Sequence, residues 1–266
     1  MSDKILVFIP MYNCQKQITR VLGQLNQEIL NYVSEIIVIN NRSTDDSENI
    51  TIEYCKQNPQ LPVKILRNKE NYGLGGSHKV AFNYAIKNKF DYMITLHGDD
   101  QGQIVDFLPI LKNLEYRKYD CCLGSRFMKG SKLEGYSKFR TFGNIVYNLL
   151  FSIGTGQKIY DLGSGLNMYK VDILRDQYYS KFKDNLMFNY YEILSHAYSD
   201  HKILFFPIVW KEEDQVSNVK MMNQATRTLL MLFSYVINKK GFLAKEHRDK
   251  VISDYASEVI YSNIVR

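Results

Sequence analysis

The chain has 266 residues, 45% of them hydrophobic and 23% charged, which is long and apolar enough to bury a core. This composition excludes a disordered or low-complexity protein, and no uncharged apolar stretch reaches the roughly 18 residues that span a bilayer. The net charge of +6 favours anionic partners such as nucleotides or phospholipid surfaces. No recognised nucleic-acid-binding module is present, so we expect no nucleic-acid partner.

The four cysteines, at positions 14, 55, 121 and 122, show no CxxC spacing and have no paired histidines nearby. This pattern argues against a disulfide framework or a zinc site and favours a reducing compartment. The first residues lead directly into an apolar segment without an export-type cleavage site. We therefore expect a cytoplasmic protein, with peripheral contact at the inner face of the plasma membrane left open.

The first half of the chain alternates short β-branched runs with longer helical patterns. Such alternation is typical of a parallel sheet with helices on both faces. Strands are expected at residues 5–9, 35–40, 63–66 and 91–96, and helices at 18–25, from Ser43 onward and at 80–86. The sequence therefore predicts an α/β nucleotide-binding unit with a mostly parallel sheet flanked by helices.

The second half of the chain is less regular. The pattern predicts a mobile loop at 128–140, a helix at 142–153, a turn-rich stretch at 154–165, a strand at 166–169, a helix at 186–198, a strand at 203–210 and a helical tail from 223. No repeat or linker is visible. We therefore predict one domain over residues 1–222, with a C-terminal helical extension at 223–266 packed on it.

The apolar run at 91–96 stops on a polar cluster that contains His97, Asp99, Asp100 and Gln101. In open α/β sheets, ligands bind just beyond the carboxyl ends of parallel strands. Carboxylate oxygens near a carboxamide suit Mg²⁺ or Mn²⁺, which often shares its coordination with substrate phosphates. The cluster points to phosphate-ester chemistry at a divalent ion, and a strand followed by a polar turn is the simpler alternative.

A glycine-rich segment at 68–77, with Gly73 and Gly75, precedes a predicted helix. Glycine lets backbone N–H groups approach phosphate oxygens, and a helix N-terminus favours the anion. The segment matches neither GxGxxG nor a Walker loop, and the chain has no Gly-x-Ser-x-Gly elbow. Kinase, dehydrogenase and serine-hydrolase functions therefore receive no support.

Several short motifs occur in a fixed order between residues 5 and 220. They are Ile-Pro-Met-Tyr-Asn at 9–13, Ile-Asn-Asn-Arg-Ser-Thr-Asp at 39–45, Asn-Tyr-Gly-Leu-Gly at 71–75, Leu-His-Gly-Asp-Asp-Gln at 96–101, Gly-Ser-Arg at 124–126, Asp-Leu-Gly-Ser-Gly at 161–165, Tyr-Glu at 191–192 and Gln-Val-Ser-Asn-Val-Lys at 215–220. The set resembles the family 2 glycosyltransferases, particularly the polyprenyl-phosphate sugar transferases such as dolichol-phosphate mannose synthase.

The resemblance implies a GT-A fold, a nucleotide-sugar donor and direct displacement with inversion at the anomeric carbon. It implies that Asp99, with His97 and Gln101, holds Mg²⁺ or Mn²⁺ on the donor diphosphate, and that Arg126 stabilises phosphate charge. The residues that it implies in nucleotide-sugar binding are Pro10, Tyr12, Asn13, Asn41, Asp45, Gly73, Gly75, Asp99, Asp100 and Lys220.

Two departures from the family pattern bear on the substrates. Positions 40–41 read Asn-Asn where the family usually has Asp-Asp, which leaves the nucleotide base open. Positions 189–190 read Asn-Tyr where family members that glycosylate a sugar hydroxyl often carry Glu-Asp, with the Asp as general base. The change favours a phosphate acceptor, which is already an anionic nucleophile, or moves the base role to Asp161 or Glu192.

We predict an inverting, metal-dependent enzyme that moves a sugar from a UDP- or GDP-sugar to a polysaccharide, glycolipid or polyprenyl-phosphate acceptor, in the assembly of bacterial surface polysaccharide such as capsule. The segment at 227–250 pairs an apolar run with basic residues, which fits either an anionic membrane surface or a packed terminal helix. The rival functions are a sugar nucleotidyltransferase and a non-catalytic nucleotide-sugar-binding scaffold on a degenerate transferase fold. The sequence gives no indication of the oligomeric state.

Overall fold

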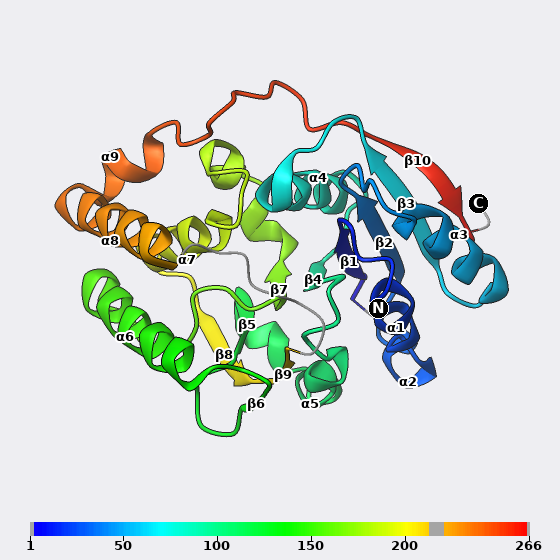
Figure 1. The fold of residues 1–266 in the computed structure, drawn as a ribbon, viewed down its shortest axis with the longest axis horizontal. Helices are drawn as coiled ribbons and strands as arrows, with labels where there is room; N and C mark the ends of the chain where they lie inside the picture. Colours follow the sequence, from blue (N-terminus) through cyan, green and yellow to red (C-terminus); the bar gives the residue numbers. More distant parts are fainter. Residues whose placement is uncertain (1–2, 213–220, 265–266) are drawn as a thin grey trace.

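The computed structural model describes residues 3–212 and 221–264. Within these residues, the main sheet has eight strands in the order β10-β3-β2-β1-β4-β7-β5-β8 (Figure 1). Their bounds are β1 Ile5–Met11, β2 Glu35–Asn40, β3 Val63–Asn68, β4 Tyr92–Leu96, β5 Cys121–Ser125, β7 Leu166–Lys170, β8 Ile203–Pro207 and β10 Ser257–Ser262. Two short parallel strands, β6 Lys132–Glu134 and β9 Val209–Lys211, form a second sheet.

Most neighbours in the main sheet are parallel. Strands β3, β2, β1 and β4 pair side by side in one direction, and β5 pairs in parallel with β8. Strand β7 lies between β4 and β5 and is antiparallel to both, and β10 is antiparallel to β3 at the sheet edge. The carboxyl ends of β1, β2, β4 and β5 therefore meet at one edge of the sheet, where loops can gather a site.

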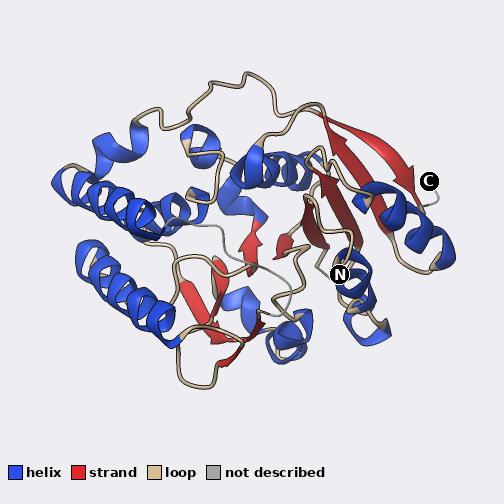
Figure 2. Ribbon diagram, in the orientation of Figure 1, coloured by secondary structure: helices blue, strands red, loops and turns tan. Residues whose placement is uncertain are grey.

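Helices cover both faces of the sheet (Figure 2). One face packs on α1, α2 and α5, and the other packs on α4, α7, α8 and α9. Their bounds are α1 Ile18–Gly23, α2 Gln27–Leu30, α3 Ser47–Gln57, α4 Gly73–Lys87, α5 Leu108–Lys112, α6 Lys138–Thr155, α7 Phe188–Tyr198, α8 Met221–Ile237 and α9 Lys239–Ala244. The sheet is therefore buried on both sides, as its continuous apolar strands predict.

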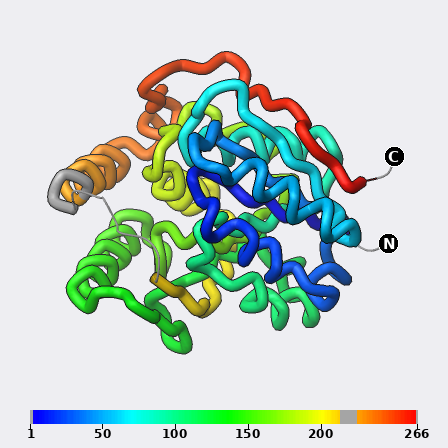
Figure 3. Tube along the Cα trace, turned by 45° about the vertical axis from the view of Figure 1, so that its right-hand side comes forward, coloured from blue at the N-terminus to red at the C-terminus, as the bar shows by residue number. Residues whose placement is uncertain are grey.

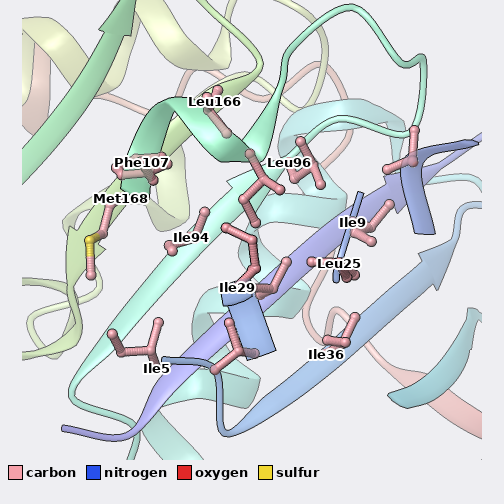
Figure 4. Close-up of a cluster of buried hydrophobic side chains, with 14 of the residues drawn as sticks. Ile5, Ile9, Leu25, Ile29, Ile36, Ile94, Leu96, Phe107, Leu166 and Met168 are labelled. Carbon is pink, nitrogen blue, oxygen red and sulfur yellow. The ribbon is translucent and has the colours of Figure 1, made fainter. Parts of the chain in front are cut away.

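The core divides into two clusters because side chains along a strand alternate between faces. In β1, Ile5 and Ile9 point into the cluster under α1 and α2, where Figure 4 shows them near Leu25, Ile29 and Ile94. Leu6 and Phe8 enter the cluster under α4 and α7 instead. The sheet thus holds the two helix layers apart and fixes the position of its carboxyl edge.

The strands and helices predicted from the sequence are confirmed in order, with shifted bounds. The glycine-rich segment at 68–77 lies partly within a helix, because α4 already begins at Gly73. The predicted N-terminal start at Ser43 is wrong, since α3 begins at Ser47. The predicted loop at 128–140 contains β6 and the first turn of α6, and the single strand expected at 203–210 is two strands, β8 and β9.

The C-terminal segment returns to the sheet. Helices α8 and α9 fit the expected helical tail, but residues 257–262 form β10, which pairs with β3 across a register shift between Val259 and Tyr261. Figure 3 shows this strand running along the outer edge of the molecule. The tail is therefore not helical throughout, and the division at residue 222 stays a prediction.

In the chain that the structure describes, no helix combines the length and hydropathy that crossing a bilayer requires.

Because Phe8 lies fully buried on the central strand, we expect Phe8→Ala to lower the free energy of unfolding by about 3–5 kcal/mol. Chemical denaturation measures this change. Val105→Ala is a suitable control, since Val105 is 51% exposed and its truncation should change the free energy by less than about 0.5 kcal/mol. Equal effects of the two substitutions would contradict the packing described here.

Candidate active site

Two adjoining cavities lie at the carboxyl edge of the sheet. The first, of about 430 Å³, is called the sheet-edge cavity and is lined by the ends of β1 and β4 and the start of α4. The second, of about 480 Å³, is called the aromatic cavity because its wall includes Tyr136, Phe139, Tyr147, Tyr190 and Trp210. Together they offer space for two different molecules on either side of a shared wall.

The shared wall contains the predicted metal ligands. Leu74, His97, Asp99 and Leu186 line both cavities. Gln101 lines the aromatic cavity beside them. The structure therefore brings the three predicted ligands to the junction, where a group bridging two substrates would lie.

Close backbone packing fixes the loop that carries these ligands. The Gly98 amide donates to the Pro10 carbonyl at 3.2 Å, and a Cβ at Gly98 would lie only 2.6 Å from that oxygen. The His97 amide donates to the Gly165 carbonyl at 3.0 Å, and a Cβ at Gly165 would lie 2.6 Å from the His97 ring. Glycine is required at both positions because any side chain would displace the loop.

The electrostatics of the junction suit a cation. Burial raises the pKa of Asp99 to about 6, an effect that the Gln101 backbone N–H opposes. Burial and the positive charge of Arg126 lower the pKa of His97 to about 4, so its ring is neutral at pH 7. The His97 Nε2 atom is buried and has no hydrogen-bond partner in the structure. A cation would satisfy this nitrogen and stabilise the Asp99 carboxylate.

The donor set fits a divalent ion only in part. Within residues 3–212 and 221–264, no group of three or more His, Cys, Asp or Glu side chains is placed to hold a metal. Asp99, His97 and Gln101 supply one carboxylate, one imidazole and one carboxamide. Such a partial shell fits Mg²⁺ or Mn²⁺ when substrate phosphates and waters supply the remaining ligands.

Asp100 lines neither of the two cavities, and its role in nucleotide-sugar binding stays a prediction. Its backbone has a positive φ of 60°. The carboxylate instead accepts hydrogen bonds from Arg20 Nε at 2.6 Å and from Gln24 Nε2 at 2.8 Å. Asp100 therefore anchors the loop to the end of α1.

Five of the predicted nucleotide-sugar residues line the sheet-edge cavity, namely Pro10, Tyr12, Asn41, Gly73 and Asp99. The amide of Asn41 is already engaged, because its Oδ1 accepts from the Tyr72 backbone and its Nδ2 donates to Asn71. Asn41 thus holds the start of α4 against β2, and its oxygen is not free to accept a bond from a nucleotide base as the sequence suggested.

Three other predicted residues, Asn13, Asp45 and Gly75, do not line the sheet-edge cavity. Asn13 Oδ1 accepts from the Thr44 amide at 2.8 Å, and Asp45 accepts from the Ser47 amide at 3.1 Å. Despite partial burial, the hydrogen bond from Ser47 keeps the pKa of Asp45 below its usual value. Gly75 lies within α4, where a Cβ would lie 2.7 Å from Phe188. These residues lie in the loops and the helix around the cavity and do not line it, so their contact with the donor stays a prediction.

Arg126 and Asp161 form one buried pair beside the junction. Arg126 Nε and Nη2 each donate to the Asp161 carboxylate at 2.8 Å, and the Arg126 and Gly163 amides donate to the same group. Burial would lower the pKa of Arg126, but Asp161 raises it. Arg126 faces the aromatic cavity, whereas Asp161 has its oxygens filled by these donors. Asp161 therefore orients Arg126 and is poorly suited to accept a substrate proton.

Glu192 is placed in the protein interior, which argues against its predicted role as a base. It is 2% exposed and lines a small cavity of about 10 Å³, which shares Leu162, Gly163 and Asn189 with the wall of the aromatic cavity. Its Oε2 accepts from Tyr169 at 3.1 Å, whereas Oε1 has no partner. Burial raises the pKa of Glu192 to about 8, so the carboxyl is largely protonated at pH 7.

Lys220 and the rest of the predicted motif at 215–220 lie outside the described residues. Sequence reasoning missed several residues that line the cavities, including Asn71, Ser77, Asn144, Asn189 and Trp210. Asn71 belongs to a motif that the sequence singled out, so that motif could have indicated it. Trp210, the one tryptophan of the chain, comes from β9 and is brought to the cavity only by tertiary folding.

The buried Glu192 carboxyl predicts a pH-dependent stability. Between pH 5 and 8 the folded protein keeps this proton and the unfolded chain, with its pKa near 4.5, loses it. Stability from this group should therefore fall as pH rises, by up to about 1.4 kcal/mol per pH unit. We expect Glu192→Gln to flatten the fall, as measured by denaturation at pH 5, 6.5 and 8. Identical pH profiles for the two proteins would contradict a protonated Glu192.

Comparison with known proteins agrees with this geometry. Residues 6–177 match the family model described as glycosyl transferase family 2. An uncharacterized protein of Methanocaldococcus jannaschii is 24% identical over 240 residues, which are 86% of this chain and 99% of the relative. An undecaprenyl-phosphate mannosyltransferase of Micrococcus luteus is 24% identical over 172 residues, which are 65% of this chain and 68% of the relative.

Two solved structures share the fold. One is a mannosyltransferase from Pyrobaculum calidifontis in complex with GDP-Man and Mn²⁺, with a TM-score of 0.61, 15% identity and coverage of 92% of this chain and 69% of that chain. The other is glucosyl-3-phosphoglycerate synthase from Mycobacterium tuberculosis with Mn²⁺, UDP and phosphoglyceric acid, with a TM-score of 0.63, 14% identity and coverage of 89% and 79%. The chain belongs to glycosyl transferase family 2 and is a nucleotide-sugar-dependent glycosyltransferase with the GT-A fold.

Proposed function

We propose that this glycosyltransferase moves a sugar from a UDP- or GDP-sugar to a phosphate group on a polyprenyl-type lipid, with inversion at the anomeric carbon and with a bound divalent ion. The acceptor oxygen forms a bond to the anomeric carbon as the bond to the donor diphosphate breaks. Such a product would serve the assembly of bacterial surface polysaccharide or glycolipid. The relatives named as undecaprenyl-phosphate transferases support this acceptor class.

The sheet-edge cavity is the proposed donor site. It adjoins the N-terminus of α4, whose backbone N–H groups favour an anion, and it ends at Asp99. Two fold relatives hold UDP or GDP-Man with Mn²⁺. Asp99, His97 and Gln101 would hold Mg²⁺ or Mn²⁺, which supplies positive charge for the departing diphosphate. Arg126 adds a fixed cation on the other side of the junction.

The acceptor assignment rests on one observation in the aromatic cavity. Of its described lining residues, Asp99 is the one carboxylate, and Arg126 and Arg140 are each paired with an acid that does not line the cavity. The Asp161 carboxylate already accepts several hydrogen bonds, and Glu192 is buried with a raised pKa and does not line this cavity, so neither is ready to deprotonate a sugar hydroxyl. A phosphate oxygen needs no such base, because it is already an anionic nucleophile. The cavity therefore suits a phosphate acceptor better than a neutral hydroxyl.

We expect transfer from a radiolabelled nucleotide sugar to polyprenyl phosphate and little transfer to sugar hydroxyls. Solvent extraction followed by chromatography separates the lipid product from free sugar. The same lipid without its phosphate is the matched control, since it keeps the tail and replaces the anion with a hydroxyl. Preferred transfer to the hydroxyl lipid or to an oligosaccharide would overturn the phosphate acceptor.

The neighbouring acids provide a matched test of the metal site. In a thermal-shift panel of UDP-, GDP-, CDP- and dTDP-sugars with Mn²⁺, the true donor should stabilise the protein by about 2.7 kcal/mol at a hundredfold excess over Kd. Asp99→Asn should lose the metal-dependent part of this shift. Asp100→Asn should keep the metal-dependent shift. It should lower the free energy of unfolding of the ligand-free protein by about 0.5–1 kcal/mol, because Arg20 and Gln24 lose a charged partner.

Reversal of these two results would move the metal site from Asp99 to Asp100. A donor shift that is equal with and without Mn²⁺ would remove the metal from the proposal while leaving the donor site in place.

A further inference from the structure

Two neighbouring helices expose an unusually apolar surface. On α6, Phe139, Phe142, Leu149 and Ile153 are 59–75% exposed, at a spacing that places them on one side of the helix. On α8, the exposed apolar residues are Leu229, Leu230, Phe233, Val236 and Ile237. Large apolar patches of this kind on a folded protein mark a surface that contacts a partner or a membrane.

The two exposed stripes lie on helices that pack against each other, and we call them together the α6–α8 face. The helices lie side by side in Figures 1 and 3 and contact each other. Gly154 allows this close approach, because a Cβ there would lie 2.8 Å from Leu232 and 3.1 Å from Val236. Gly154 therefore meets Val236 at the seam between the helices, and Val236 is still 49% exposed.

The charged residues within α6 and α8 have one sign. Neither α6 nor α8 contains an Asp or Glu. Exposed basic residues stand near the helix ends, at Lys138, Lys158, Arg227 and Lys240. Arg140 is left out of this group because Glu212 pairs with it at 2.6 Å. An apolar stripe with a basic rim is complementary to anionic lipid headgroups above an acyl layer.

The α6–α8 face is also continuous with the aromatic cavity. Phe139 and Gly143 from the first turns of α6, together with Ala225 and Thr228 from α8, line that cavity. Phe139 belongs to both, since it is 75% exposed and lines the cavity wall. A molecule whose tail lies along the face could therefore place its polar end in the cavity.

We propose that the α6–α8 face docks on the surface of an anionic lipid bilayer, with the aromatic cavity opening at the headgroup level. Delivery of the acceptor by this route rests on the proposed function, whereas docking itself does not. A second copy of the chain is less suited to the face. It would bring two basic rims together, and neither helix offers a carboxylate to pair with them.

Vesicle sedimentation tests the docking without donor or acceptor. We expect binding to vesicles of phosphatidylcholine with phosphatidylglycerol, weaker binding to phosphatidylcholine alone, and loss of binding as salt is raised. Phe142→Ser/Phe233→Ser should weaken the binding by at least about tenfold. Val251→Ser/Val259→Ser is the matched control, because these side chains are 65% and 57% exposed but lie outside α6 and α8, and it should bind as the wild type.

A site-specific label gives an independent readout of the orientation. All four native cysteines are buried, so a polarity-sensitive dye can be directed to an added cysteine. The dye on Phe142→Cys should shift its emission to the blue with anionic vesicles, and the dye on Val251→Cys should not. The reverse pattern, or equal binding by the Phe142→Ser/Phe233→Ser variant and the wild type, would overturn the proposal.

Light scattering tests the alternative that a second copy of the chain covers the α6–α8 face. A concentration-dependent dimer that Phe142→Ser/Phe233→Ser abolishes, in a protein that ignores vesicles, would assign the face to a second copy and overturn the bilayer. Vesicle binding is measured without polyprenyl phosphate, so it does not depend on sugar transfer. Intact vesicle binding together with failed transfer in the polyprenyl-phosphate assay would therefore overturn the proposed function alone.

Discussion

The site depends on the antiparallel strand β7 between β4 and β5. Its pairing with β4 places Leu166 opposite Leu96, which presses Gly165 against the His97 ring and leaves no room for a side chain there. The turn that leads into the same strand carries Asp161 to Arg126 at the end of β5. One strand thus sets both the metal-side loop and the cationic side of the junction, so the two halves of the site cannot move independently.

The sequence predicted the fold where its signals are local. Buried parallel strands are recognised as apolar runs in the sequence. The polar cluster after β4 lies at the sheet edge where the carboxyl ends of parallel strands meet, as α/β topology predicts. The hydrogen bonds of Asp100 could not be predicted, because its partners Gln24 and Arg20 lie 76 and 80 residues away in the chain. Strand β10 escaped prediction because its partner, β3, is nearly two hundred residues away in the chain.

Glu192 and Asp161 show why residue type alone could not assign a general base. Both are acidic residues in family motifs, yet one is protonated by burial and the other is filled by Arg126 and two backbone amides. These environments arise from packing between α7, β7 and the turn after β5, which no sequence window contains. Among the described residues that line the aromatic cavity, this packing leaves Asp99 as the one carboxylate, and the lack of a free base is what favours an anionic acceptor.

The strand β10 has a consequence for how copies of the protein meet. A parallel strand at the end of a sheet exposes a row of unpaired N–H and C=O groups, which can template pairing with another chain. Here β10 occupies that row along β3, and Arg67 of β3 reaches Glu258 beside it. The outermost strand is bent by an irregularity between Val259 and Tyr261, and a bent edge is a poor template. By covering the edge of β3, strand β10 therefore protects the protein against strand-to-strand aggregation.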